Sequence, residues 1–276
     1  MVKWFVPWEF DPAAVLGLAV AVAAYALGLA RGARPAYWRR VLYGLGVLSM
    51  YAVMHTRLDY FAQYLFSAHR AQHLVLYHLG PFLIALSDPL PVWRRAPGAA
   101  VQAPRSAVRV YRCLQQPAVA GLLFVGLIAF WLIPSVHFDA MLSRDLYLLM
   151  NWSMAIDGLL FWWLMLAPRG GGHLVDPGYG TRIVVLVAVM FPQIAIGAFI
   201  ALGPSDLYDV YAVCGRAFPL SPAQDQLYGG LITWIPAAMM SVVGALTLLR
   251  RWRREEAGPV GGGRERLPQE SGRENG

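Results

Sequence analysis

The sequence predicts an all-α fold: a polytopic membrane bundle of seven transmembrane helices, with the N-terminus outside and the C-terminus cytoplasmic. Composition predicts the membrane class, because the 276 residues are 58% hydrophobic and only 14% charged. A soluble domain keeps about 25% charged residues to cover its surface. The number of apolar stretches predicts the helix count, and the distribution of arginines predicts the orientation.

Seven stretches approach the roughly 20 apolar residues that a helix needs to cross a bilayer. They are residues 13–30, 41–56, 67–87, 117–133, 146–167, 181–202 and 225–249. The second is short, and we expect it to continue into an interfacial segment from Arg57 to Phe66. Arginines follow the first stretch instead of preceding it, so we expect a retained span and not a cleaved signal peptide. Residues 1–256 are thus predicted to form one transmembrane domain, followed by a disordered cytoplasmic tail over 257–276.

The orientation rests on 18 basic residues that fall on one side of the predicted spans. The other side holds five, namely Lys3, Arg57, Arg70, Arg144 and Arg216. Loops rich in Lys and Arg stay cytoplasmic. This asymmetry places the chain in a bacterial inner membrane, and it accounts for the net charge of +7 without a nucleic-acid partner.

Four of the six histidines are predicted to gather at the outer boundary of the membrane. His55 ends the second span, His69 and His73 open the third, and His137 follows the fourth. His69 and His73 are four residues apart, so on a helix they share one face. Two imidazoles with that spacing are able to bind one metal ion.

Met54 stands directly before His55, and thioether with imidazole ligands suits Cu(I) better than magnesium or calcium. We therefore predict a copper site of His55, His69 and His73, with Met54 or His137 in support and Gln72 orienting an imidazole. The alternatives are plainer: helical histidines that bond backbone carbonyls or lipid headgroups, and methionines that fill gaps in a core.

Asp157 is predicted to lie in the middle of the fifth span. A carboxylate at that depth is costly and marks either a function or a buried partner. Basic residues are distant along the helix, so we expect a neutral, hydrogen-bonded Asp157 that faces the bundle interior. Asn151 or a polar group of a neighbouring helix is the expected partner.

Three motifs resemble the CtaG family of seven-helix proteins associated with assembly of cytochrome c oxidase, notably the caa type. The first is His69-Arg-Ala-Gln-His73-Leu-Val-Leu, which continues to Gly80-Pro81 and Asp88-Pro89-Leu90. The second is Gly158-Leu-Leu-Phe-Trp-Trp163, and the third is Asp225-Gln226-Leu-Tyr-Gly229-Gly230-Leu-Ile-Thr-Trp234. The resemblance covers about residues 40 to 250.

The chain departs from the family pattern at two positions. Asn151 stands where the family commonly has a histidine, and Asp157 stands where a small residue is expected. One plausible ligand is therefore lost and one carboxylate is new. The resemblance implies a membrane assembly factor, and not an enzyme, whose partners are cytochrome c oxidase subunits and periplasmic copper donors.

Three other functions stay open at this point. Haem ligation requires an axial histidine from each of two opposed helices, whereas His69 and His73 adjoin on one helix. Transport of metal ions or protons would use Asp157 within the bundle. A structural scaffold for oxidase assembly would bind no metal at all.

Overall fold

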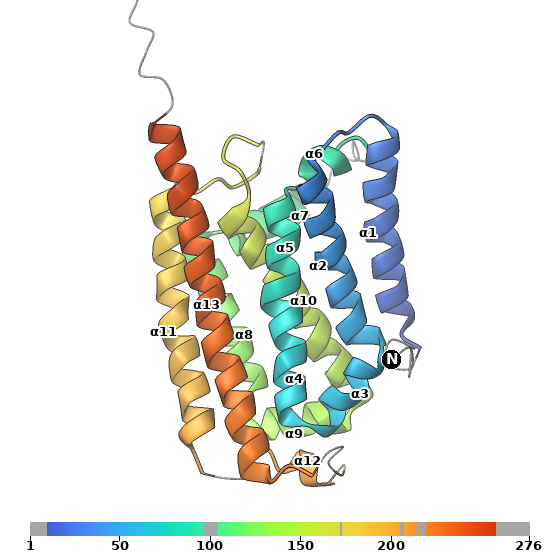
Figure 1. Ribbon diagram of the computed structural model, residues 1–276, viewed down its shortest axis with the longest axis vertical. Coiled ribbons are helices and arrows are strands. Elements are labelled where there is room, and N and C mark those ends of the chain that lie inside the picture. Colours follow the sequence, from blue (N-terminus) through green and yellow to red (C-terminus); the bar gives the residue numbers. More distant parts are fainter. Residues whose placement is uncertain are drawn as a thin grey trace, which may run out of the picture.

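The computed structural model describes residues 10–96, 104–171, 173–204, 207–213, 215 and 219–257, and these residues form an all-helical bundle (Figure 1). The long helices are α1 (Pro12–Ala30), α2 (Tyr37–His55), α8 (Pro117–Trp131), α10 (Arg144–Leu166), α11 (Tyr179–Leu202) and α13 (Pro222–Glu256). A continuous helical run consists of α4 (Phe66–His73), the π-helix η2 (Leu74–Leu79) and α5 (Gly80–Ser87). The short helices are α3 (Arg57–Tyr64), α6 (Leu90–Trp93), α7 (Arg105–Leu114), α9 (Pro134–Leu142) and α12 (Val210–Val213). The all-α prediction is confirmed.

Four of the described helices are long and apolar enough to cross a membrane: α1, α10, α11 and α13. The pair α7 and α8, bent by 74°, would make a fifth if it formed one crossing. The predicted second and third spans correspond to α2, which carries Arg39 and Arg40 in its first turn, and to the run α4–η2–α5. Length and composition of the helices therefore confirm a membrane protein with several spans, but not the number seven. The tail expected after Ala257 lies outside the described residues.

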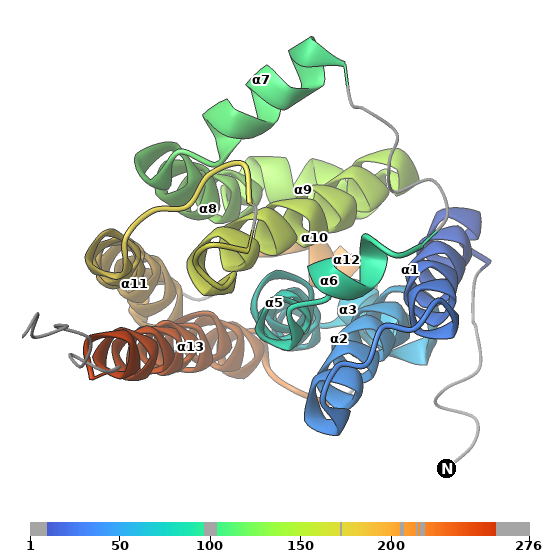
Figure 2. The same cartoon turned by 90° about the horizontal axis from the view of Figure 1, so that it is seen from above.

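The run α4–η2–α5 lies at the centre of the bundle, in contact with α2, α10 and α13 (Figure 2). Helices α11 and α13 pack side by side along their length, and α1 packs against α2 at the periphery. The short helices α3, α9 and α12 gather at one end of the bundle, and α6 lies at the other end with the end of α13 (Figure 1).

The π-helix at the centre has a cause in the sequence. Pro81 has no N–H, so it cannot donate to the carbonyl of Tyr77, the position four residues earlier. The indole Nε1 of Trp162 donates to that carbonyl instead, at 3.1 Å, while Gly80 N donates to Val75 O five residues back. Gly158 lets α10 approach, because a Cβ there would lie 2.6 Å from the Tyr77 carbonyl oxygen. Thus the first and second sequence motifs meet at one backbone irregularity.

Candidate functional site

Three buried histidines form a cluster between α4 and α9. The rings of His69 and His73 are 4.4 Å apart between centroids, and the ring of His137 lies 5.1 Å from that of His69. The Nε2 atoms of His69 and His73 are 3.1 Å apart, and all three side chains are at most 2% exposed. The four-residue spacing predicted the first pair, and His137, predicted as a supporting ligand, lies beside His69.

Hydrogen-bond partners define which nitrogens carry protons. Arg70 donates to His73 Nδ1 at 2.7 Å, so neutral His73 carries its proton on Nε2. That Nε2–H faces Asn151 Oδ1 at 2.9 Å and also the Nε2 of His69. His69 Nδ1 lies 3.3 Å from the carbonyl oxygen of Ala62, which only accepts, so His69 Nε2 keeps its lone pair. The one proton on His73 Nε2 is therefore shared between two acceptors, Asn151 Oδ1 and His69 Nε2.

The hydrogen bonds of His137 likewise fit a neutral ring. Its Nδ1–H donates to the carbonyl oxygen of Trp131 at 3.1 Å, and its Nε2 accepts from the hydroxyl of Tyr211 at 2.9 Å. Burial, followed by the nearby charge of Arg70, lowers the pKa of His137 to about 3. This side chain is thus an uncharged imidazole at any physiological pH.

Arg70 is the residue of the cluster that the sequence reasoning missed, because it was counted only as an outer positive charge. The side chain is 3% exposed, and no carboxylate among the described residues forms an ion pair with it. Its guanidinium bonds His73 and lies 6.0 Å from the ring of Phe66, while its Nε has no hydrogen-bond partner. Its place three residues before His73 on a helix was the available signal.

The third sequence motif positions the start of α4. Asp225 of α13 accepts hydrogen bonds from the backbone N–H groups of Phe66 and Ser67, both at 2.9 Å, and from the Ser67 hydroxyl at 2.6 Å. Leu65 at the N-cap supplies no side-chain acceptor, so a carboxylate from another helix takes that role. Asp225 therefore fixes the helix that carries His69 and His73.

The remaining residues of that motif pack α13 against its neighbours. Gln226 bonds Leu207 N, Ile200 O and Pro204 O, which ties down the end of α11. A Cβ at Gly229 would lie 2.2 Å from the ring of Phe66, and one at Gly230 would lie 2.5 Å from Ala201 N. Trp234 has its Cβ against Gly197 of α11. The motif thus holds α4, α11 and α13 together.

His55 occupies a different environment. It is buried, its Nδ1 accepts from Asp11 N at 3.3 Å, and its ring lies 5.2 Å from Tyr51 and 5.9 Å from Phe10. None of its recorded contacts within the described residues involves His69 or His73. His55 therefore joins α2 to the start of α1.

Gln72 bonds a carboxylate and a phenol in place of an imidazole. Its Nε2 donates to Val53 O at 2.7 Å and to Asp59 Oδ1 at 2.8 Å. The hydroxyl of Tyr147 lies 2.6 Å from Asp59 Oδ1 and 3.2 Å from Gln72 Oε1. These bonds connect α3, α4 and α10 directly beside the histidine cluster.

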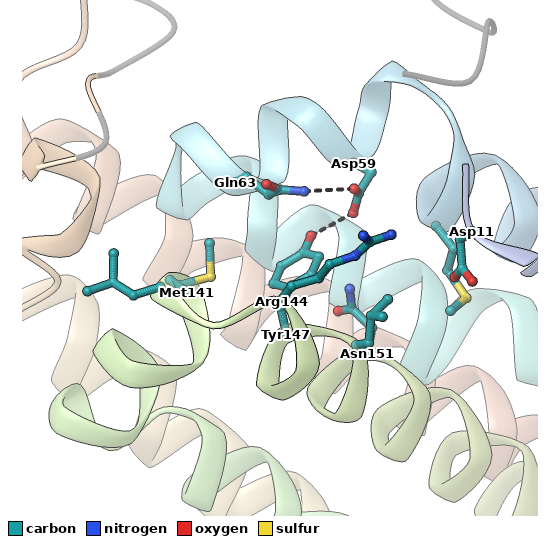
Figure 3. A pocket seen from close by; sticks show the side chains of 10 residues that line it. Asp11, Asp59, Gln63, Met141, Arg144, Tyr147 and Asn151 are labelled. Atoms are coloured by element: carbon teal, nitrogen blue, oxygen red, sulfur yellow. Dashed lines mark hydrogen bonds between the residues drawn. The ribbon is translucent and has the colours of Figure 1, made fainter. Parts of the chain in front are cut away.

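A cavity of about 270 Å³ opens at this end of the bundle (Figure 3). Figure 3 shows Asp59, Tyr147, Arg144 and Asn151 grouped, with Met141 on one side of the view and Asp11 on the other. The lining residues are Asp11, Met54, Asp59, Gln63, Met141, Leu142, Arg144, Tyr147, Leu148 and Asn151. Asn151 and Tyr147 form the wall toward the cluster, since Asn151 bonds His73 and the Tyr147 ring lies 5.9 Å from His69.

Two thioethers and a carboxylate are candidate cation ligands in this cavity, which Arg144 also lines. Met54 and Met141 reach it from α2 and α9, and Asp11 comes from the start of α1. Asp11 Oδ1 accepts from Ala13 N, whereas its buried Oδ2 has no partner among the described residues. Thioether sulfur favours Cu(I), and a carboxylate raises the local concentration of any cation.

Asp157 is half-buried and accepts from the hydroxyl of Tyr77 at 2.6 Å. The same hydroxyl lies 2.5 Å from the carbonyl oxygen of Phe124. The Tyr77 hydroxyl has one proton, but it lies within hydrogen-bonding distance of two oxygens, those of Phe124 and Asp157. Both contacts are hydrogen bonds at once if Asp157 is protonated and supplies the second proton. The prediction of a hydrogen bond to a neighbouring helix is confirmed, and the partner is Tyr77 instead of Asn151.

A metal site ready for occupancy is absent from the described residues: they contain no group of three His, Cys, Asp or Glu side chains that could hold an ion. The histidine pair offers two imidazole nitrogens, and the cavity offers a carboxylate with two thioethers. Cu(I) accepts two or three soft ligands, so either set is able to suit it.

Fold and site together define an all-helical membrane protein with a buried histidine cluster behind a cavity at one end of the bundle. The sequence model described as cytochrome c oxidase caa3 assembly factor (Caa3_CtaG) matches residues 23–255. The chain belongs to this family, which confirms the resemblance carried by the three motifs.

A curated relative is 25% identical over 288 residues, an uncharacterized protein of Mycobacterium leprae (strain TN). The match covers 93% of this chain and 41% of the relative, so the chain spans about two fifths of that protein's length. No solved structure matches the chain.

Proposed function

We propose that this protein is an assembly factor that receives Cu(I) as cargo at the periplasmic face and delivers it to cytochrome c oxidase. The family supports the assembly role, and the residues at the outer end support the cargo. The observation that carries the proposal is the pair of Nε2 atoms of His69 and His73, 3.1 Å apart and buried behind a cavity with two methionines.

Copper would be captured in the cavity and then held by the histidines. Met54, Met141 and Asp11 line the entrance, and Asn151 separates them from His73. Imidazole nitrogens bind metals at about 2.0–2.1 Å, so an ion between the two Nε2 atoms needs them about 4 Å apart. The pair must therefore widen by roughly 1 Å, and His73 must carry its proton on Nδ1 instead of Nε2, which requires Arg70 to turn its N–H away from Nδ1.

We infer seven crossings with the N-terminus outside, in support of this location. Four helices are individually long and apolar enough to cross a membrane. Helix α2, the run α4–η2–α5 and helix α8 supply the other three crossings. The histidine cluster, α3 and α9 then lie at the end of the bundle that is poor in basic residues. The client would be a membrane oxidase in the bacterial inner membrane, supplied through periplasmic copper donors.

The proposal is tested in a strain that lacks the chromosomal gene. The double variant His69→Ala/His73→Ala should leave the amount of the protein normal, abolish oxidase activity, and regain part of it when copper is added to the medium. His173→Ala, in the loop at the opposite end, serves as the matched control and should behave as wild type. Full oxidase activity with the double variant would contradict copper delivery through this pair.

A second candidate function is a metal-free scaffold, and Arg70 favours it. A buried guanidinium bonded to His73 repels a metal cation, and no carboxylate in the described residues offsets it. Under this alternative the histidines would serve only to hold α4, α9 and α10 together. Oxidase activity that is lost in the double variant and unaffected by copper, with no copper on the purified protein, would favour the scaffold.

A further inference from the structure

Helix α7 is amphipathic, with its charged residues gathered on one face. Arg105, Arg109 and Arg112 follow the spacing i, i+4, i+7 and share one face. Ala107, Val110, Tyr111 and Leu114 fall on the opposite face by the same spacing. The helix contains no acidic residue.

The helix does not pack into the bundle. None of its residues is buried, and Val110 is 58% exposed. The three arginines form no recorded hydrogen bond or ion pair with a described residue. Figure 2 shows α7 beyond α8 at the edge of the molecule. Tyr111 and Leu114 are half-buried whereas the arginines and Val110 are exposed, so the chain covers α7 only in part.

The direction of α7 relates it to the membrane surface. It meets α8 at 74°, across a break of two residues, so it lies nearly at right angles to a helix of the bundle. Gln115 fixes this elbow, because its Nε2 donates to the carbonyl oxygen of Leu160 in α10 at 3.0 Å. An elbow at the end of a membrane helix places the next helix along the interface.

We propose that α7 lies in the membrane–water interface and binds anionic phospholipid headgroups through Arg105, Arg109 and Arg112. Its apolar face enters the acyl chains beside α8, and its guanidinium groups reach phosphates, the arrangement of an interfacial amphipathic helix. Charge complementarity indicates the partner of α7, because three arginines without a carboxylate match an anionic lipid leaflet. A crossing formed by α7 and α8 together would instead bury the arginines in hydrocarbon.

The experiment uses the full chain, purified and reconstituted into vesicles. A nitroxide label is placed at position 110 through Val110→Cys, after Cys113→Ser and Cys214→Ser remove the native thiols. Collision rates with oxygen, which partitions into lipid, and with a water-soluble nickel chelate report the depth of the label. Vesicles of phosphatidylcholine alone are compared with vesicles containing phosphatidylglycerol.

The label should be several-fold more accessible to oxygen than to nickel in the phosphatidylglycerol vesicles, and less so in phosphatidylcholine alone. The triple variant Arg105→Gln/Arg109→Gln/Arg112→Gln should abolish this dependence on lipid charge. Arg250→Gln/Arg253→Gln/Arg254→Gln removes equal charge from the end of α13 and should preserve it. Gel filtration checks that each variant is folded.

Two results would overturn the proposal. A label that is accessible mainly to nickel in both vesicles would mean that α7 does not lie on the membrane. A lipid-accessible label with no response to lipid charge or to the triple variant would mean that the arginines do not bind headgroups.

Discussion

At the scale of single residues, the chemistry of the site depends on one shared proton. His73 is fixed by Arg70 on one nitrogen and faces both Asn151 and His69 with the other. The spacing of His69 and His73 in sequence was enough to predict their proximity. The spacing of Arg70 from His73 was a signal for their contact, whereas the hydrogen bond of Asn151 to His73 joins two helices 78 residues apart and has no local signal.

The first prediction at this scale concerns the hydrogen bond between Asp157 and Tyr77. An amide at this position is able to donate to the Tyr77 hydroxyl as a protonated carboxyl would, so Asp157→Asn should preserve folding and oxidase activity. Asp157→Leu leaves the Tyr77 hydroxyl one partner short and should lower the thermal midpoint of the purified protein. An Asn variant present at normal level but without oxidase activity would instead indicate a proton or metal role for the carboxylate.

The lowered pKa of His137 predicts how the stability of the folded protein depends on pH. Its folded pKa of about 3 lies below the unfolded value near 6.5, so the unfolded chain binds more protons between these values. Stability should therefore fall as pH drops from about 6.5 toward 3, by up to about 1.4 kcal/mol per pH unit from this residue.

His137→Gln should make that fall shallower, because glutamine does not titrate. Thermal midpoints of the detergent-solubilised protein between pH 4.5 and 7 provide the measurement. His173→Gln, in a more exposed position, should change the slope less. Equal slopes for His137→Gln and wild type would show that His137 is not buried as an uncharged ring.

At the scale of elements, the π-helix η2 changes the directions in which the side chains before and within it point. In an α-helix His78 would point about 140° away from His73, at roughly 100° per residue. In the structure both line one small cavity together with Arg70, and neither ring nitrogen of His78 has a hydrogen-bond partner among the described residues. The cause lies in the sequence at Pro81, but the donor to the freed Tyr77 carbonyl, the indole of Trp162, lies in a distant motif.

A substitution at Gly158 tests the close packing of α10 on η2 directly. Gly158→Ala would place a methyl group 2.6 Å from the carbonyl oxygen of Tyr77, and backbone atoms cannot rotate away. We expect a loss of about 1–3 kcal/mol, the cost of overpacking, seen as a lower thermal midpoint. The matched control is Gly126→Ala on α8, where a methyl group meets no atom within 4 Å. Equal midpoints for the two variants would refute close packing of α10 on η2.

At the scale of the whole molecule, composition and periodicity predicted an all-helical membrane protein, and the three motifs predicted its family. The individual spans were less predictable. Residues 67–87 are divided by a π-helix, and α8 is a 15-residue helix with a sharp elbow before it. The contact of His55 with the start of α1 was not predictable, because no local pattern encodes it.

The predicted orientation is tested by reporter fusions. A fusion in the loop before Arg105 should report the cytoplasm, and one in the segment around His137 should report the periplasm. The reason is that the first loop holds five arginines, whereas the second holds Arg144 alone. A periplasmic signal from the Arg105 loop would invert the bundle and move the histidine cluster to the cytoplasmic face.

Copper binding by the purified protein tests the central claim most directly. Wild-type protein, titrated with Cu(I) under anaerobic conditions against a coloured copper chelator, should retain one ion per chain. His69→Ala/His73→Ala should lose that ion to the chelator, and His173→Ala should retain it. Failure of the wild-type protein to compete for Cu(I), or equal retention by the double variant, would contradict copper delivery through the His69–His73 pair.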